Sequence, residues 1–425
     1  MSSLLRVITI LLAAAAGACT SLRKTIEIDN GDLIDCVEIY QQPAVNKNNA
    51  SSSSLLGSQQ IHQAKSSERS MKAAIAGNND DAASRLKKKA RQQSWRKHGS
   101  CPEGSVPILR PASSRRNPEV AELVRRASPF RRPRPAGNNG SSSVVFFLPE
   151  AGMDTPTGKV EVAAAYSTDG PFLGAKADIP YWKIGAVHPA EFSMSYLLIG
   201  NTLDPNYRPM PGAKPPPDLT NQIAVGLIAW PSHFGDSLLR LFVYYTTDGG
   251  VASNCFNLEC NGFQLQHSEI ALGDSWDKSD SEVGGDRFGV TVSIHRDPAG
   301  DNWRVSVMNE DIGYYPETIF NTRFPQAAYV EMGGRVLDTR PGGAHTATPM
   351  GNGIPACAGS RFAATIMEYS GINFNGALFN DAAHRTIATS PSCYGANPMG
   401  FGRSRQGYNV AFGGPGGKYC DQPDD

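Results

Sequence analysis

The sequence predicts an all-β protein whose main domain is an antiparallel β-sandwich. After residue 143 it breaks into many short runs of strand-forming residues, separated by frequent glycine and proline. No long run there has the spacing of an amphipathic helix. Two strand-like runs, 223–230 and 238–247, are joined by turn residues as in a hairpin. Many short strands with Gly- and Pro-rich turns are typical of a sandwich.

The N-terminus has the pattern of a signal peptide. Arg6 supplies a positive charge, residues 7–16 are apolar, and residues 16–18 are small enough for cleavage. About ten apolar residues are too few to span a bilayer. We therefore expect residues 1–19 to be removed, and a secreted mature form without a membrane segment.

Two low-complexity stretches precede the main domain. Residues 46–80 are rich in Ser, Asn and Gln, which predicts disorder, and Asn49 begins a glycosylation sequon. Residues 115–143 form a basic Pro- and Ser-rich linker with a second sequon at Asn139. Paired arginines at 125–126 and 131–132 suit a processing protease, and a basic spacer that is never cut is the alternative.

The charge is unevenly distributed along the chain. The formal net charge of the 425 residues is zero, yet Lys and Arg outnumber acids up to Arg134 and the rest leans acidic. This asymmetry predicts attraction between leader and body. Nucleic acid is not an expected partner, because the basic runs are Pro- and Ser-rich with little aromatic interleaving.

Further strands are expected along the main domain. The best candidates alternate apolar and polar residues and end at turn sequences, and they cover residues 159–166, 174–184, 191–199, 287–295 and 303–308. Residues 205–217 are too rich in proline for a sheet interior.

The chain has eight cysteines, and Cys19 borders the expected cleavage site. A secreted protein is exposed to an oxidising compartment, so the remaining thiols should pair. We expect Cys255–Cys260, Cys393–Cys420 and Cys36–Cys101. Cys357 is then left over, either free, bonded to another molecule, or buried as a small apolar residue.

The hairpin region also carries a family resemblance. It holds Asn221, Ile223 and Gly226, then Pro231 before a Gly-Asp turn, and then the Cys-Phe-Asn-Leu-Glu-Cys clip of residues 255–260. These motifs are similar to those of the plant neprosins, which are secreted glutamic peptidases. The resemblance implies two curved antiparallel sheets packed face to face, with a concave substrate face, and a location in the apoplast or cell wall.

Motifs on both sides of the hairpin extend the resemblance from Ile34 to Cys420. Residues 34–37 and 101–110 are similar to the neprosin pro-segment, and residues 313–320 and 327–336 to later neprosin strands. The implied organisation is a signal peptide (1–19), a partly disordered pro-segment (20–114), the linker (115–143) and a peptidase domain (144–425).

The resemblance implies chemistry by two glutamates on facing strands, and this chain carries neither. The two positions are Ala224 and Arg335. One carboxyl must take a proton from the attacking water while the other donates one. Alanine has no titratable group, and arginine stays protonated. We therefore predict that most or all peptidase activity is lost.

Other residues could replace the missing acids. Glu331 is the best substitute, because it lies four positions before Arg335 and points to the same face of a regular strand. Glu161, Glu191 and Asp248 are further candidates, each more typical of a surface residue. Arg335 itself could hold a substrate carboxylate, pair with a neighbouring acid, or face solvent.

Neprosins tend to cut after proline and prefer acid, so proline-containing peptides are the expected partners, beside the chain's own pro-segment. Trp182, Trp230 and Tyr329 offer flat apolar surfaces for a proline ring, although ordinary core packing would also explain them. A carbohydrate-binding sandwich is a further alternative, supported only by analogy of fold. No motif of a serine, pepsin-type or metal-dependent hydrolase is present, so no metal or cofactor is expected.

Overall fold

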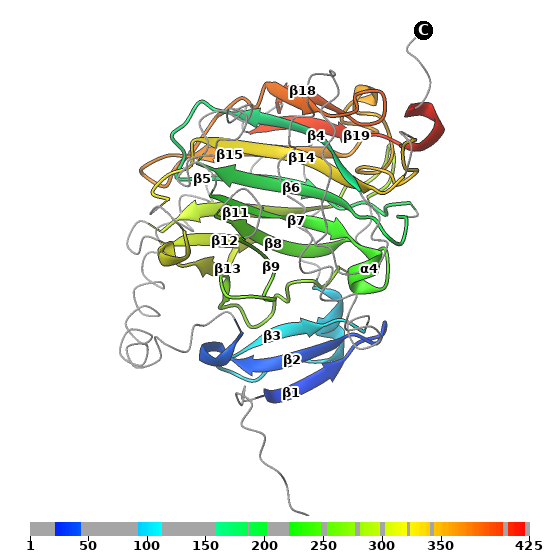
Figure 1. Cartoon of the computed structure of the whole chain (residues 1–425). Coiled ribbons are helices and arrows are strands. Elements are labelled where there is room, and N and C mark those ends of the chain that lie inside the picture. Colours follow the sequence, from blue (N-terminus) through cyan, green and yellow to red (C-terminus); the bar gives the residue numbers. More distant parts are fainter. Residues whose placement is uncertain are drawn as a thin grey trace, which may run out of the picture.

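The computed structural model describes residues 22–43, 92–112, 158–185, 187–201, 221–247, 253–276, 281–297, 302–320, 324–340, 344–402 and 407–420. Two large antiparallel sheets pack face to face, and a small three-stranded sheet lies at their lower end (Figure 1). The expected signal peptide, the two sequons, the basic linker and the proline-rich loop lie outside the described residues.

The seven-stranded sheet faces the viewer in Figure 1. Its strands, in order across the sheet, are β17 (Arg385–Ala388), β4 (Lys159–Ser167), β14 (Tyr329–Asp338), β6 (Ser193–Gly200), β7 (Gln222–Ala229), β8 (Arg240–Thr246) and β9 (Asn254–Phe256).

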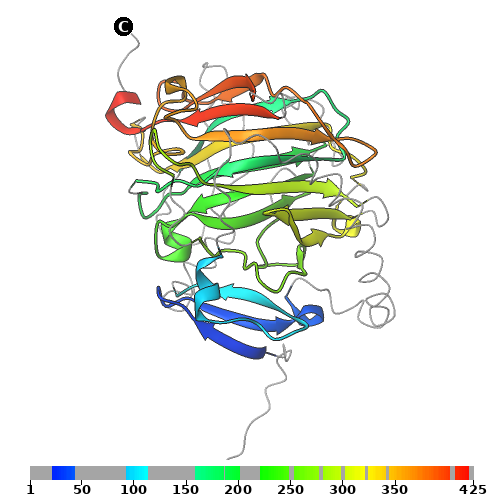
Figure 2. The ribbon, with the colours of Figure 1, turned by 180° about the vertical axis from the view of Figure 1, so that it is seen from behind.

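The second sheet has nine strands and is seen from behind in Figure 2. Its order is β10 (Gln264–Leu265), β13 (Glu310–Tyr315), β12 (Trp303–Val307), β11 (Gly289–Arg296), β5 (Gly174–Pro180), β15 (Thr365–Ile372), β19 (Tyr408–Gly413) and β18 (Gly395–Phe401), with β16 (Leu378–Phe379) paired to β15. The predicted antiparallel sandwich is confirmed.

Helices are few and short in the described part of the chain. They are η1 (Ile39–Gln41), η3 (Ser94–His98), α4 (Pro231–Phe234), η5 (Glu317–Ile319), η6 (Ala356–Ala358) and η7 (Gly417–Cys420). None of these described helices has the length and apolar character needed to cross a membrane.

The predicted hairpin is present. β7 and β8 pair antiparallel, and α4 forms the turn between them. The strand expected over residues 174–184 ends earlier, at Pro180. A proline has no backbone N–H for the ladder, so it is a natural end for a strand inside a sheet.

Each strand of the seven-stranded sheet presents two different faces. The inner face of β7 carries Ile223, Val225 and Leu227, which belong to the large core between the sheets. Its outer face carries Gln222, Ala224 and Ile228. All eight residues of β7 are buried, so the strand reads as a nearly continuous apolar run.

The three-stranded sheet consists of β1 (Leu22–Glu27), β2 (Leu33–Glu38) and β3 (Ser105–Arg110). Two glutamines attach this part of the chain to the main body. Gln42 exchanges two hydrogen bonds with the backbone of Leu265, at 2.9 Å each. Gln93 does the same with Ala271, at 2.9 and 2.7 Å.

A buried ion pair adds to this attachment. Arg240 on β8 is fully buried and places Nη1 3.1 Å from Oδ2 of Asp32, between β1 and β2. The same guanidinium pairs with Asp236 and donates to the carbonyl of Gly273. The three-stranded sheet therefore docks through specific polar contacts in addition to apolar packing.

The cysteines pair as the sequence led us to expect. The structure has disulfides Cys36–Cys101, Cys255–Cys260 and Cys393–Cys420. Cys357 is the free cysteine among the described residues, and it is exposed. The alternative of a buried apolar thiol at Cys357 is therefore wrong. The residue lies in the short η6 turn, which leaves its side chain in solvent.

Candidate active site

The strand register brings the two vacant glutamate positions to one face. Ala224 on β7 lies opposite Leu198 on β6, and Leu198 lies opposite Glu331 on β14. Arg335 follows four residues after Glu331 on the same strand. The register of β14 runs without interruption through its two glycines. Ala224, Glu331 and Arg335 therefore all point to the outer face of the seven-stranded sheet.

Ala224 is packed mainly among apolar and aromatic side chains. It is fully buried within the outer-face cluster, which also contains Leu198 and Tyr244 from the two neighbouring strands. Gly226, two residues along, has no room for a side chain, because a Cβ there would lie 2.1 Å from the carbonyl oxygen of Ser195. This part of β7 offers no group that could transfer a proton.

Arg335, Glu331 and Tyr196 form a buried group and contact one another. Nη2 of Arg335 lies 2.7 Å from Oε1 of Glu331, and Nε of Arg335 donates to the Tyr196 hydroxyl at 3.0 Å. The Tyr196 hydroxyl donates in turn to Oε1 of Glu331. The guanidinium carbon lies 5.0 Å from the centre of the Tyr196 ring. Of the roles considered for Arg335, the structure shows pairing with a neighbouring acid.

The electrostatics fix the protonation of this group. Burial opposes the charge of Arg335, but the neighbouring Tyr196 and Glu331 outweigh it and raise the arginine pKa above its ordinary value. Burial also raises the pKa of Tyr196 well above its usual range. The arginine therefore stays charged and the tyrosine stays protonated, so neither group can act as a base.

The described strands of this face place no second acid next to Glu331. Among the outward-facing residues of the described strands β4, β14, β6, β7 and β8, it is the only acid. Its carboxylate is already held by Arg335 and Tyr196. A pair of carboxyls with different pKa values is therefore not present on these strands.

Two of the three aromatic candidates lie on the outer face. Trp230 and Tyr329 are buried in the same cluster as Ala224. Trp182 instead belongs to the large core between the sheets. It follows β5 of the opposite sheet, so it does not lie on the face that carries Ala224 and Arg335. No described strand or helix lies in front of β14, β6 and β7 (Figure 1).

Two polar residues of this face were not among the site residues predicted from the sequence. Tyr196 and Gln222 lie on β6 and β7 and point outward, where the alternation of these strands places them. The signal was available, because a glutamine or tyrosine among apolar residues of a buried strand needs a hydrogen-bond partner. The long-range partner itself cannot be read from strand alternation.

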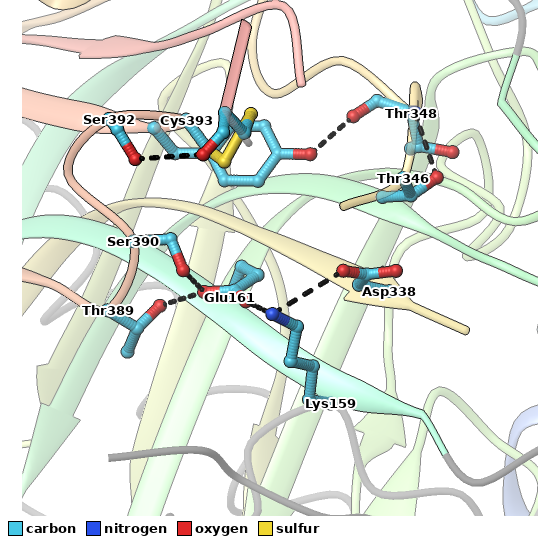
Figure 3. Close-up of a disulfide and its surroundings, with 11 residues drawn as sticks. Lys159, Glu161, Asp338, Thr346, Thr348, Thr389, Ser390, Ser392 and Cys393 are labelled. Atoms are coloured by element: carbon cyan, nitrogen blue, oxygen red, sulfur yellow. Dashed lines mark hydrogen bonds and ion pairs between the residues drawn. A yellow bond between two sulfur atoms is a disulfide. The ribbon is translucent and has the colours of Figure 1, made fainter. Parts of the chain in front are cut away.

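The substitute acids Glu161 and Glu191 are buried, so their interpretation as surface residues was wrong. Glu161 points inward from β4, where it receives hydrogen bonds from Thr389 and Ser390 and lies 2.7 Å from Nζ of Lys159 (Figure 3). Glu191 accepts hydrogen bonds from threonines in the later loops, including Thr346. Asp248 lies outside the described residues.

Glu161 makes the stability of the fold depend on pH. Burial raises the pKa of Glu161, but hydrogen bonds from Lys159, Ser390 and Thr389 outweigh it and leave the pKa below its ordinary value. A lowered pKa contributes stability above the unfolded pKa of about 4.3, and that stability is lost as the pH falls through the folded pKa.

We predict that Glu161→Gln lowers the free energy of unfolding at pH 7 by about 1.5–3 kcal/mol, the value of hydrogen bonds to a charged group. The difference from wild type should shrink as the pH falls toward about 3. Urea denaturation at several pH values measures it. Glu38→Gln, in an exposed ion pair with Arg23, is the matched control and should change stability little at any pH. A pH-independent loss in Glu161→Gln would contradict the assignment.

One group of side chains of the types that bind metal ions lies away from this face. Side-chain ligand atoms of His345, Cys393 and Cys420 lie within 4.8 Å of one another. The two sulfurs are joined in a disulfide, so neither is a thiolate that could bind a metal.

The chain is similar to known protein families and to solved structures. The Neprosin family matches residues 190–415, and the Neprosin activation peptide matches residues 25–132. Scytalido-glutamic peptidase with a peptide-based transition-state analogue is 9% identical, with 61% of this chain and 100% of that chain covered at a TM-score of 0.29.

Two further solved structures match parts of this chain. SCP-B, a member of the Eqolisin family of peptidases, is 9% identical, covering 61% of this chain and 100% of that chain at a TM-score of 0.28. A glycoside hydrolase family 16 endo-glucanase from Bacteroides ovatus is 12% identical. The match covers 46% of this chain and 70% of that chain at a TM-score of 0.23.

Proposed function

The chain belongs to the Neprosin family, and from this premise we propose that it binds proline-rich peptides on its outer face without cleaving them. The observation that carries the proposal is the pairing of Arg335 with Glu331, at 2.7 Å, on the same face as the buried methyl group of Ala224, with β6 between them. The resemblance to neprosins puts the active site on this face, and the described residues of the face do not supply the pair of carboxyls that its proton chemistry needs.

Hydrolysis of an amide by this route needs two separate proton transfers. One carboxyl removes a proton from water, and another supplies one to the leaving nitrogen or to the oxyanion. Glu331 is a single carboxylate, and Arg335 and Tyr196 already use it. A second group with the opposite role is missing from the described strands of this face.

Peptide binding is supported by what the outer face keeps. It is lined by apolar and aromatic side chains, including Trp230 and Tyr329. Flat aromatic rings pack well against proline, which is why proline-rich segments dock to aromatic surfaces. The family supplies the expectation that the ligand is a peptide.

We further propose that the protein is secreted and made as a precursor. The described disulfides fit an oxidising compartment. The activation-peptide region, which contains β1, β2 and β3, is the chain's own pro-segment. Processing within residues 115–143 would separate it from the main domain.

Restoring both acids should restore cleavage. We predict that Ala224→Glu together with Arg335→Glu raises turnover of a proline-containing peptide at acid pH by at least about 10²-fold over wild type, because general acid–base catalysis contributes 10²–10⁴. Mass spectrometry of the digested peptide measures turnover. The two single substitutions serve as controls and should stay near the wild-type level.

The same assay tests the alternative of an active peptidase. Wild-type turnover at acid pH that is abolished by Glu331→Gln would show that Glu331 acts with a substitute acid, and the proposal would fail. Binding of glycans without binding of peptides would favour the carbohydrate-binding alternative.

A further inference from the structure

The activation-peptide region meets the main body along residues 264–276, which we call the docking segment. The segment begins with β10 and continues as an irregular chain to Trp276. Hydrogen bonds join it to β8, because the N–H of Gly273 donates to the carbonyl of Leu241 at 2.7 Å and the N–H of Leu241 donates to the carbonyl of Asp274 at 3.0 Å. The docking segment thus extends the main body beyond the start of β8, and the three-stranded sheet lies against this end of the molecule (Figure 1).

Peptide groups of the docking segment are hydrogen-bonded to side chains of the activation-peptide region. Gln42 pairs with both the N–H and the carbonyl of Leu265, and Gln93 pairs with both groups of Ala271. Leu265 and Ala271 are fully buried. If the region left, these peptide groups would lose their partners, which is unfavourable in a folded protein.

A buried carboxylate of the docking segment is held by the same region. Asp274 is 1% exposed, and its two oxygens accept hydrogen bonds from the Ser94 hydroxyl at 2.6 Å and from the Trp95 N–H at 3.1 Å. The backbone N–H of Ser94 also donates to the carbonyl of Ser275 at 2.9 Å. A buried carboxylate needs such donors, because a charge without them is costly to bury. Asp274 therefore depends on residues 180 and 179 positions earlier in the chain.

The apolar packing is also shared between the two parts. Val106 on β3 is 1% exposed and belongs to the large core between the main sheets. Conversely, Ala271 of the docking segment belongs to the core of the three-stranded sheet, together with Trp95 and Ile34. Leu109 packs against that core and against the outer-face cluster. Apolar packing thus continues across the boundary, as it does inside a single domain.

One disulfide keeps the two halves of the activation-peptide region together. Cys36 on β2 is bonded to Cys101, which precedes β3. Residues 22–43 and 92–112 therefore remain covalently joined even when the chain between them is cut. The region can act as one piece toward the main body.

We propose that the activation-peptide region is a permanent component of the folded protein and stays bound to the main body after the linker is cut. A cut within residues 115–143 separates the two parts as polypeptides, and the contacts above hold them together as a complex. The inference goes beyond the proposed peptide binding and is compatible with it, because no described strand or helix lies in front of β14, β6 and β7 (Figure 1). The lasting partner of the main domain is then the N-terminal region of its own chain.

The experiment cuts the full-length protein and tests whether the fragments separate. Trypsin cleaves after Lys and Arg, so a brief treatment should cut the basic linker. Size-exclusion chromatography follows at pH 7 and about 100 nM protein, a concentration at which a complex with a micromolar Kd dissociates. Mass spectrometry identifies the fragments in each peak. We expect the fragments that contain β1, β2 and β3 to elute with the main body at the volume of the uncut protein.

A substitution at the contact tests what holds the fragments together. Gln93→Met removes both hydrogen bonds to Ala271 and leaves that buried peptide group without a partner, so we expect about ten-fold weaker association. Chromatography of the cut protein in increasing urea should show separation at a concentration lower by roughly 0.5–1 M than for wild type. Arg110→Met is the control, because Arg110 pairs with Asp35 in an exposed contact within the three-stranded sheet, and it should separate as wild type does.

Two results would overturn the proposal. One is separation of the cut wild-type protein into two peaks at pH 7 without denaturant. The other is separation of Gln93→Met at the same urea concentration as wild type, because the contacts with the docking segment would then not hold the fragments. Neither result concerns the absence of cleavage activity, which the peptide assay above tests independently.

Discussion

Replacing Arg335 by methionine is expected to lower the free energy of unfolding by about 3–5 kcal/mol, the cost of removing one partner of a buried ion pair. Methionine keeps much of the apolar bulk of arginine and removes its charge. Glu331, which is 5% exposed, would then be left as a buried carboxylate whose remaining partner is the Tyr196 hydroxyl. Urea denaturation at pH 7 measures the loss.

A second substitution tests the reason for that loss. In Arg335→Met with Glu331→Gln the uncompensated charge is gone, so we expect a large part of the stability to return, because replacing both partners of a buried pair is often near neutral. Arg23→Met is the surface control, since the exposed pair of Arg23 with Glu38 should contribute about 1 kcal/mol or less. Equal losses in Arg335→Met and Arg23→Met would contradict the buried ion pair of Arg335 with Glu331.

Arg240→Met is expected to have a comparable effect, about 3–5 kcal/mol, at a different place in the molecule. Arg240 is fully buried and joins Asp32 of the three-stranded sheet to Asp236 and Gly273 of the main body. Without it, two carboxylates lose their shared cation. Because burial of Asp32 depends on docking, the three-stranded sheet should separate from the main body before the large sheets unfold.

Limited proteolysis and fluorescence measure this separation. We expect residues 22–43 and 92–112 to be cleaved first, and the fluorescence of the fully buried Trp95 to change at lower urea than that of the other tryptophans. Arg110→Met is the matched control, because Arg110 and Asp35 form an exposed pair within the same three-stranded sheet. A single transition in Arg240→Met at the wild-type midpoint would contradict the prediction.

Much of the fold could be predicted from local pattern. The run of strand-forming residues along β7, and the turn residues between β7 and β8, predict the hairpin. The pairing of cysteines followed from their positions along the chain. These features depend on residues close together in sequence, so a linear pattern records them.

The environment of the site could be predicted only in part. The resemblance placed Ala224 and Arg335 on facing strands, but they lie on β7 and β14 of one sheet, with β6 between them. The four-residue spacing correctly placed Glu331 beside Arg335. Tyr196, which completes the group, comes from 135 residues before Glu331. Its role depends on the order of β6 and β14 in the sheet, and that order is a property of the tertiary fold.

The burial of charged side chains is the other feature that the sequence did not predict. Glu161 and Glu191 are acidic residues of a type usually exposed, and each is enclosed by hydroxyl groups that lie far away in sequence. The sequence near either glutamate contains no sign of those hydroxyls. Partners of this kind become visible only when the strands and loops are assembled.

Gln42 and Gln93 each meet the main body through the peptide groups of Leu265 and Ala271, and never through the side chains there. Each amide donates one hydrogen bond to a peptide group and accepts one from it, as a neighbouring strand would do. Recognition of this kind does not depend on the side chains of the contacted residues. Positions 265 and 271 can therefore vary as far as their apolar packing allows. The three-stranded sheet region and the main body can therefore accumulate substitutions during evolution and still dock to each other.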